Sequence, residues 1–319
     1  MPTPVGARAI AFCSIALFAS LAAQATEATP EELLRRMGVA LRTADFEGSF
    51  VYTHDGRTDA LRIFHLGGAE ERERLVSLTG ARSEIVRNGR MITCLTPGAA
   101  PTEFANRAGA SLLPLMPNVR ELGEQYSIGA AGADRVAGYD ARVIELAPRD
   151  PYRYGYRLWL ERNSQLLLRS AVLDAARRPL EQFMFVALDI GSKPTETELS
   201  ATGDLGSASA PSGEVAVTAK PLWRIADAPA GFRLVRTQRP LDGDPKSEHL
   251  VYSDGIASVS IYIEPHTDAT QAVTESTIVR GVLSIHSRDA GGLRITALGD
   301  VPPATVQVMA RGVRSIAAR

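Results

Sequence analysis

Residues 85–92 read Ile-Val-Arg-Asn-Gly-Arg-Met-Ile, two short apolar runs joined through Asn88 and Gly89. Asn-Gly is the preferred pair for a two-residue hairpin turn, because both central positions need a positive φ. The stretch therefore predicts an antiparallel hairpin, whose second strand continues through Cys94 and Leu95. Hairpins of this kind decide the fold of the first half of the chain.

Alternating apolar and polar residues extend the pattern on both sides of this hairpin. Further strands are expected at residues 46–52, 61–65, 153–160, 166–173 and 183–190. Turn signals stand between neighbouring runs, such as His54-Asp55-Gly56 and Asn163-Ser164. Consecutive strands joined by short turns predict an antiparallel meander with one apolar face.

A helix is expected before the first strand. Thr29 is a suitable N-cap, Pro30 suits the first helical position, and the pattern continues to Arg42. The apolar residues follow helical spacing on one face, at Leu33, Leu34, Met37, Ala40 and Leu41. This face should dock on the sheet.

The segment from Phe104 to Val119 interrupts the meander. It is apolar, but Pro114 and Pro117 prevent a long regular helix. Either it forms a lid or plug over the concave face of the sheet, or it is a loop with a few core anchors. Candidates for lining an apolar cavity, with ordinary core packing as the alternative for each, are Leu112, Leu113, Leu115, Met116 and, on the strand at 153–160, Trp159.

The N-terminus has the pattern of an export signal. Arg8 precedes an apolar run from Ala9 to Ala22, and Ala23-Gln24-Ala25 matches the small-x-small cleavage pattern. The run is shorter than a membrane-spanning helix needs. We expect residues 1–25 to be a signal peptide. Its cleavage removes Cys13 and leaves Cys94 as a lone, buried thiol in the periplasm.

The composition changes after the last strand of the meander. Residues 201–219 are rich in Ser, Gly, Ala and Thr and predict a flexible linker between a domain at 26–200 and a second at 220–319. In the second domain, strands are expected at 232–237, 249–253, 257–264, 278–287 and 293–298. Pro302-Pro303 then introduces a helix with Val306, Met309, Val313 and Ile316 on one face. The whole is α+β.

The residues point to binding rather than catalysis. The five His residues lack the spacing of metal ligands, and the chain has neither a nucleophile elbow nor a phosphate-binding loop. Lys and Arg number 35 against 36 Asp and Glu, which argues against a nucleic-acid partner. We therefore predict no catalytic residues, metal or cofactor. Self-association stays open, including pairing through Cys94.

Several longer stretches resemble the MucB/RseB family, in order and in both predicted domains. They are residues 46–52 (Phe-Glu-Gly-Ser-Phe-Val-Tyr), 71–80, 84–89 (Glu-Ile-Val-Arg-Asn-Gly), 154–160 (Tyr-Gly-Tyr-Arg-Leu-Trp-Leu), 180–185, 229–232, 249–255 (His-Leu-Val-Tyr-Ser-Asp-Gly) and 299–306. The resemblance covers nearly all of the chain after the signal peptide.

This resemblance implies a periplasmic regulator of an envelope-stress sigma factor. Family members bind the periplasmic part of a membrane-spanning anti-sigma factor and shield it from the site-1 protease. The larger domain is implied to be an unclosed β-barrel like that of lipoprotein carriers, and an acylated ligand, mislocalised lipoprotein or lipopolysaccharide, would cause release.

Two other functions compete with regulation of an anti-sigma factor. A periplasmic carrier of lipid or lipoprotein would use the same cavity, but it would need only the first domain. An envelope hydrolase would need a catalytic constellation that the sequence lacks. For contact with the anti-sigma factor we select Tyr252, Asp254 and Arg280, because Tyr and Arg anchor many interfaces and the turn after Tyr252 looks exposed.

Overall fold

The computed structural model describes residues 28–96, 98–99, 101–105, 124–202, 215–217, 220–240, 244, 246–266 and 275–316. The predicted signal peptide and most of the predicted linker lie outside these residues. So do four of the five cavity candidates, Leu112, Leu113, Leu115 and Met116. Among the described residues, no helix is both long and apolar enough to cross a membrane.

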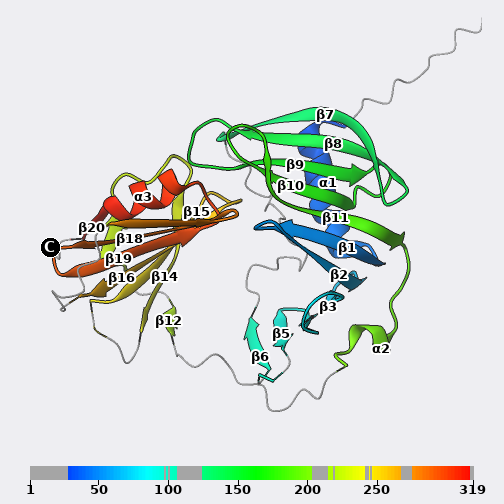
Figure 1. The fold of residues 1–319 in the computed structure, drawn as a ribbon, viewed down its shortest axis with the longest axis horizontal. Coiled ribbons are helices and arrows are strands. Elements are labelled where there is room, and N and C mark those ends of the chain that lie inside the picture. Colours follow the sequence, from blue (N-terminus) through cyan, green and yellow to red (C-terminus); the bar gives the residue numbers. More distant parts are fainter. Residues whose placement is uncertain are drawn as a thin grey trace, which may run out of the picture.

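The first domain is one large antiparallel sheet (Figure 1). Its eleven strands run in the order β6-β5-β4-β3-β2-β1-β11-β10-β9-β8-β7. Their bounds are β1 Phe46–His54, β2 Arg57–Leu66, β3 Arg72–Ser77, β4 Glu84–Asn88, β5 Met91–Leu95, β6 Thr102–Ala105, β7 Tyr126–Val136, β8 Tyr139–Pro148, β9 Gly155–Glu161, β10 Leu167–Leu173 and β11 Pro179–Ile190. Every neighbouring pair except β1 and β11 is consecutive in sequence, and β6 and β7 form the two edges, so the sheet is an unclosed barrel.

Helix α1, Pro30–Thr43, covers one face of this sheet (Figure 1). The Thr29 hydroxyl accepts a hydrogen bond from the Glu32 amide at 3.3 Å, as a cap should. Its buried face joins a core that includes Phe50 of β1 and Phe183 of β11. The predicted helix and its docking face are confirmed.

The hairpin of β4 and β5 differs from its prediction by one residue. Asn88 pairs with Met91, so it ends β4, and the two loop residues are Gly89 and Arg90. Gly89 has φ +56°, a conformation that glycine adopts without steric cost. The sequence pattern located the turn correctly but placed its centre one residue early.

The second domain is a seven-stranded sheet in the order β12-β14-β15-β16-β19-β18-β17. The strands are β12 Val215–Val217, β14 Arg233–Pro240, β15 Glu248–Ser253, β16 Ser258–Pro265, β17 Ser276–Arg280, β18 Leu283–Ala290 and β19 Leu293–Gly299. Helix α3, Pro303–Arg311, packs on one face of this sheet. Two short strands, β13 Trp223–Ile225 and β20 Val313–Ser315, pair beside it, and helix α2, Glu196–Leu199, follows the first sheet.

Several predictions for the second domain were wrong in detail. The strand expected at 278–287 is two strands, because the chain turns at Gly281 and Val282. The last helix ends at Arg311, so Val313 lies in β20 instead of on the helix. β12 lies inside the segment predicted as linker.

Cys94, predicted to be buried, is only partly buried in β5. It lies opposite Thr102 of the edge strand β6. Burial still raises the pKa of its thiol, so the reactive thiolate is disfavoured.

Candidate functional site: the contact between the two domains

A buried arginine joins the two domains. Arg153 lies in the loop between β8 and β9, and its side chain is fully buried. Its Nε donates to Asp254 of the second domain at 2.5 Å, and its other nitrogens donate to Asp150 and to the Ala230 carbonyl. The guanidinium also lies 4.8 Å from the ring centre of Phe232. Most of the groups that compensate its burial therefore belong to the other domain.

Asp254 is held in place by its own turn, between β15 and β16. Its Oδ1 accepts from the amides of Ile256 and Ala257, at 2.9 and 2.8 Å. Only Oδ2 faces Arg153. The turn thus aims one carboxylate oxygen across the domain boundary before any contact is made.

A second polar contact lies at Glu181 of β11. Its Oε2 accepts from the Tyr52 hydroxyl at 2.6 Å, and its Oε1 accepts from the Val282 amide of the second domain at 3.3 Å. Burial, together with the bond to Glu181, raises the pKa of Tyr52, so the hydroxyl stays a neutral donor. Nearby, Tyr154 of the first domain is hydrogen-bonded to Ser284 of β18.

Apolar contact between the domains is small by comparison. Val282 and Ile256 are the second-domain residues that pack into the core around α1. One further hydrogen bond runs from the Thr305 hydroxyl, at the start of α3, to the Tyr152 carbonyl at 2.8 Å. The boundary is therefore made of turns and polar side chains. Water can replace their hydrogen bonds when the domains separate.

The predicted partner-binding residues are less exposed than expected. Tyr252 is buried in the second core, where its hydroxyl accepts from the Ile225 amide. Asp254 is buried by Arg153. The expectation of an exposed turn was wrong, because the first domain covers it. Arg280, at the end of β17, is exposed. Their roles in partner binding stay predictions.

The sequence did not single out Arg153 or Glu181. Arg153 lies 101 residues from Asp254, and nothing in the residues around either one indicates a shared contact. Asp254 was selected as a contact for the anti-sigma factor, but its contact with the first domain was not predicted.

Trp159, the remaining cavity candidate, lies on the sheet face opposite α1. It belongs to a small cluster with Val143 and Leu168, and its Nε1 donates to Asp134 at 2.8 Å. The Arg169 guanidinium stacks over its ring at 4.2 Å. Trp159 lines an open groove of about 580 Å³ on this outer side, beside edge strand β7. Its role in lining a lipid cavity stays a prediction.

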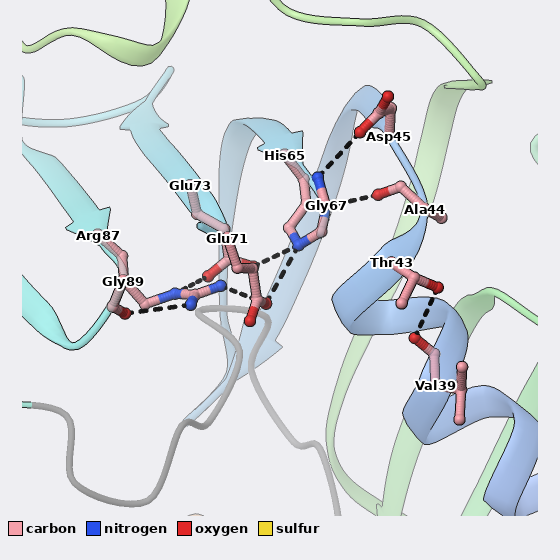
Figure 2. Close-up of polar contacts among 10 residues, drawn as sticks. All are labelled: Val39, Thr43, Ala44, Asp45, His65, Gly67, Glu71, Glu73, Arg87 and Gly89. Carbon is pink, nitrogen blue, oxygen red and sulfur yellow. Dashed lines mark hydrogen bonds and ion pairs between the residues drawn. The ribbon is translucent and has the colours of Figure 1, made fainter. Parts of the chain in front are cut away.

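A charged cluster ties the other half of the sheet to the end of α1 (Figure 2). His65 Nδ1 lies 2.7 Å from the Ala44 carbonyl and Nε2 lies 3.3 Å from Glu71. Arg87 donates to Glu71 and, at 2.7 Å, to Glu73. The guanidinium thus bridges the two carboxylates that face His65.

This cluster is the one place in the described part of the chain where three potential metal ligands converge, at His65, Glu71 and Glu73. Both nitrogens of His65 already have hydrogen-bond partners, and Arg87 occupies the carboxylates. A metal ion would have to displace that guanidinium, so the donor set does not fit one. We interpret the cluster as structural.

Comparison with known proteins identifies the relatives of this chain. The MucB/RseB N-terminal domain model matches residues 29–202, and the MucB/RseB C-terminal domain model matches residues 217–314. The chain belongs to the MucB/RseB family. This confirms the resemblance noted from the sequence.

Curated members of the MucB/RseB family are sigma-factor regulators. The chain is 35% identical to the sigma factor AlgU regulatory protein MucB of Pseudomonas aeruginosa, over 95% of both chains. It is 28% identical to the sigma-E factor regulatory protein RseB of Escherichia coli K12, over 92% of this chain and 93% of that one. Both relatives match along both domains.

Solved MucB structures share the fold of this family member. The Pseudomonas aeruginosa MucA/MucB complex matches with a TM-score of 0.74 at 31% identity, over 91% of this chain and 99% of that chain. A crystal structure of MucB with MucA(peri) matches with a TM-score of 0.72 at 30% identity, over 91% of this chain and 100% of that chain. A further crystal structure of MucB matches with a TM-score of 0.60 at 30% identity, over 90% of this chain and 98% of that chain. This family member therefore resembles the complexed structures more than the other.

Proposed function

We propose that this chain is a periplasmic regulator that binds the periplasmic part of a membrane-spanning anti-sigma factor. Bound there, it shields the anti-sigma factor from site-1 proteolysis, and a lipid-type ligand such as mislocalised lipoprotein or lipopolysaccharide causes release. The observation that carries the proposal is the match of both domains to MucB in complex with MucA. The signal-like pattern of residues 1–25 supports export to the periplasm.

The geometry agrees with a binding role in one further respect. The boundary between the domains is polar, so the domains can separate without exposing a large apolar core. A ligand that binds one arrangement better than the other would then shift the balance between them. We place acyl chains in the unclosed first domain, with the segment around Leu112, Leu113, Leu115 and Met116 and the groove at Trp159 as the candidate entrances.

The decisive experiment is a binding titration. Protein comprising residues 26–319 would be titrated with the periplasmic segment of the anti-sigma factor from the same genome, by calorimetry. The titration would be repeated with lipopolysaccharide or an acylated peptide. We expect tight binding that the amphiphile weakens, and slower site-1 cleavage of the bound segment. No binding to the segment, with acyl chains still taken up, would favour the alternative of a lipid or lipoprotein carrier.

Arg280 gives the residue-level test of the partner surface. Its side chain is exposed, so Arg280→Ala removes a potential contact without disturbing a core. We expect the dissociation constant for the anti-sigma segment to rise about tenfold if Arg280 is an anchor. Arg224→Ala, at an exposed arginine of β13, is the matched control and should leave the constant unchanged. Equal effects of the two would remove Arg280 from the partner surface.

A further inference from the structure

The contact between the domains has the properties of a separable latch. Arg153 and Asp254 have side chains that are 0% and 1% exposed, yet they come from different domains. Burying two charges is costly, and their attraction offsets this only while both are in place. When the domains part, both charges can return to water, so the contact can open without leaving a buried charge behind.

Asp254 and Arg153 each keep hydrogen bonds within their own domain when the latch opens. Asp254 keeps its bonds from the Ile256 and Ala257 amides, which belong to its own turn. Arg153 keeps Asp150, three residues before it in the same loop. Each half is therefore preorganised within its domain, and closing the contact needs little further ordering.

A glycine allows the second contact to close. At Gly281 a Cβ atom would lie 2.4 Å from Glu181 Oε1 and 3.0 Å from Asp55 Oδ1, both in the first domain. Any side chain at this position would displace the Glu181 carboxylate, which accepts from the Val282 amide. The backbone at Gly281 has φ +55°, which also favours glycine.

The whole chain superposes best on partner-bound relatives among these three MucB structures. Its TM-score is 0.74 and 0.72 against MucB in complex with MucA and 0.60 against the third MucB structure, at nearly equal identity and coverage. We infer that the contacts of Arg153 with Asp254 and of Glu181 with the turn at Gly281 latch the two domains in the arrangement that holds the anti-sigma factor. The latch thereby sets the affinity for the anti-sigma factor, although it lies outside the surface that binds the anti-sigma factor. This inference rests on the proposed function.

A double-mutant cycle tests the charge pair. The variants are Asp254→Asn, Arg153→Gln and the two combined, each in the protein of residues 26–319. Asn keeps an oxygen for the amides of Ile256 and Ala257 and removes only the charge that faces Arg153. Asp174→Asn is the matched control, because Asp174 also accepts from turn amides and pairs with an arginine, but wholly inside the first domain.

We expect each single variant to weaken binding of the anti-sigma segment by about tenfold, in the range usual for coupling between sites. The combined variant should be no weaker than either single one, because all three break the same contact. Small-angle scattering should show a larger radius of gyration in all three and no change for Asp174→Asn. Circular dichroism would verify that each variant is folded.

Gly281→Ala opens the latch without altering any charge. Gly291→Ala is its control, because Gly291 has φ +61° but open space around it, so the two share backbone strain and only the first meets the other domain. We expect Gly281→Ala to enlarge the molecule and weaken partner binding, and Gly291→Ala to do neither.

The outcomes separate the latch from the proposed function. An enlarged molecule with unchanged partner affinity would overturn the regulatory role of the latch, and unchanged size and affinity would overturn the latch itself. Additive effects in the cycle would overturn the pairing. If the unmodified protein does not bind the anti-sigma segment, the proposed function fails, and with it the claim on affinity, while scattering still decides whether the contacts hold the domains together.

Discussion

His65 of the first domain and His249 of the second are both strand histidines in sheets, yet their rings have different partners. His65 is wholly buried, with the Ala44 carbonyl at one ring nitrogen and Glu71 at the other. His249 has Gln238 at Nδ1 and no partner at its buried Nε2. The comparison teaches that a histidine enters a sheet either with both ring nitrogens bonded or with one left unsatisfied, according to the groups that face it.

The same contrast separates the two domains more broadly. The first sheet buries several charged side chains in compensated sets, such as Arg87 with Glu73 and Arg74 with Glu84. In the second, the ring of His249 stacks on Tyr262 at 4.2 Å, and burial lowers the pKa of His249 to about 4, with Arg236 acting in the same direction. The domains should therefore respond differently to loss of a partner and to pH.

Removing Arg87 should have the largest effect. Arg87→Met removes the guanidinium that contacts both Glu71 and Glu73 (Figure 2). Breaking a buried charge cluster in this way is expected to lower the free energy of unfolding of the first domain by about 3–5 kcal/mol. Urea unfolding would measure it. A loss below about 1 kcal/mol would mean that water reaches the carboxylates, and that the cluster resembles a surface ion pair.

The chain provides both a control and a reporter for this measurement. Arg62 pairs with Glu47 at the surface, so Arg62→Met should cost less than about 1 kcal/mol. The chain has two tryptophans, Trp159 in the first domain and Trp223 in the second. Fluorescence in a Trp223→Phe background follows the first domain alone, and in a Trp159→Phe background the second.

Lowering the pH should reduce the stability of the second domain, because His249 is neutral in the folded protein. The pKa of His249 in the folded protein lies near 4, below its ordinary value of 6.5. Between these two pH values the unfolded chain therefore binds the proton more readily than the folded protein does. Stability that is fully present above pH 6.5 is therefore lost as the pH falls toward 4, by about 2 kcal/mol for a partly accessible ring. Urea unfolding followed by Trp223 would measure it, and His249→Gln should flatten the profile across that window. An unchanged profile would assign the acid sensitivity to other groups.

The first domain should lose its own acid-sensitive stability at lower pH. Burial raises the pKa of Glu71, but the bonds from His65 and Arg87 outweigh this, and the net pKa lies below 4.5. Stability from Glu71 is present above its unfolded pKa and is lost as the pH falls through the folded one. The two domains should therefore lose stability in successive pH windows, the second domain first.

The smallest effect concerns the caps of the two long helices. Thr29 caps α1 through its side chain, whereas Pro302, the N-cap residue of α3, makes no side-chain hydrogen bond. Thr29→Ala should therefore lower the stability of the first domain by about 1 kcal/mol and leave the second unchanged. Thermal unfolding of the two single-tryptophan proteins would compare them. An equal shift in both would mean that the domains unfold as one unit.

Local patterns accounted for most of the secondary structure. Alternation located strands such as β9, and a cap, a proline and helical spacing located α1. The errors lie at turns: the hairpin at Gly89, the unnoticed turn at Gly281 and the helix end at Arg311. Turn position depends on which residues pair across the strands, and the chain alone does not display that pairing.

The sequence by itself determined the strand-rich first domain, the helix on it, the family and hence the regulatory class, because period-2 alternation, capping and long matching runs are all local. The tertiary structure alone decided which charges are buried and with whom. Arg153 and Asp254 lie 101 residues apart, and each looks like an ordinary surface residue in its own segment. Only the meeting of two turns from different domains removes them from water, and that removal gives the contact its energetic weight.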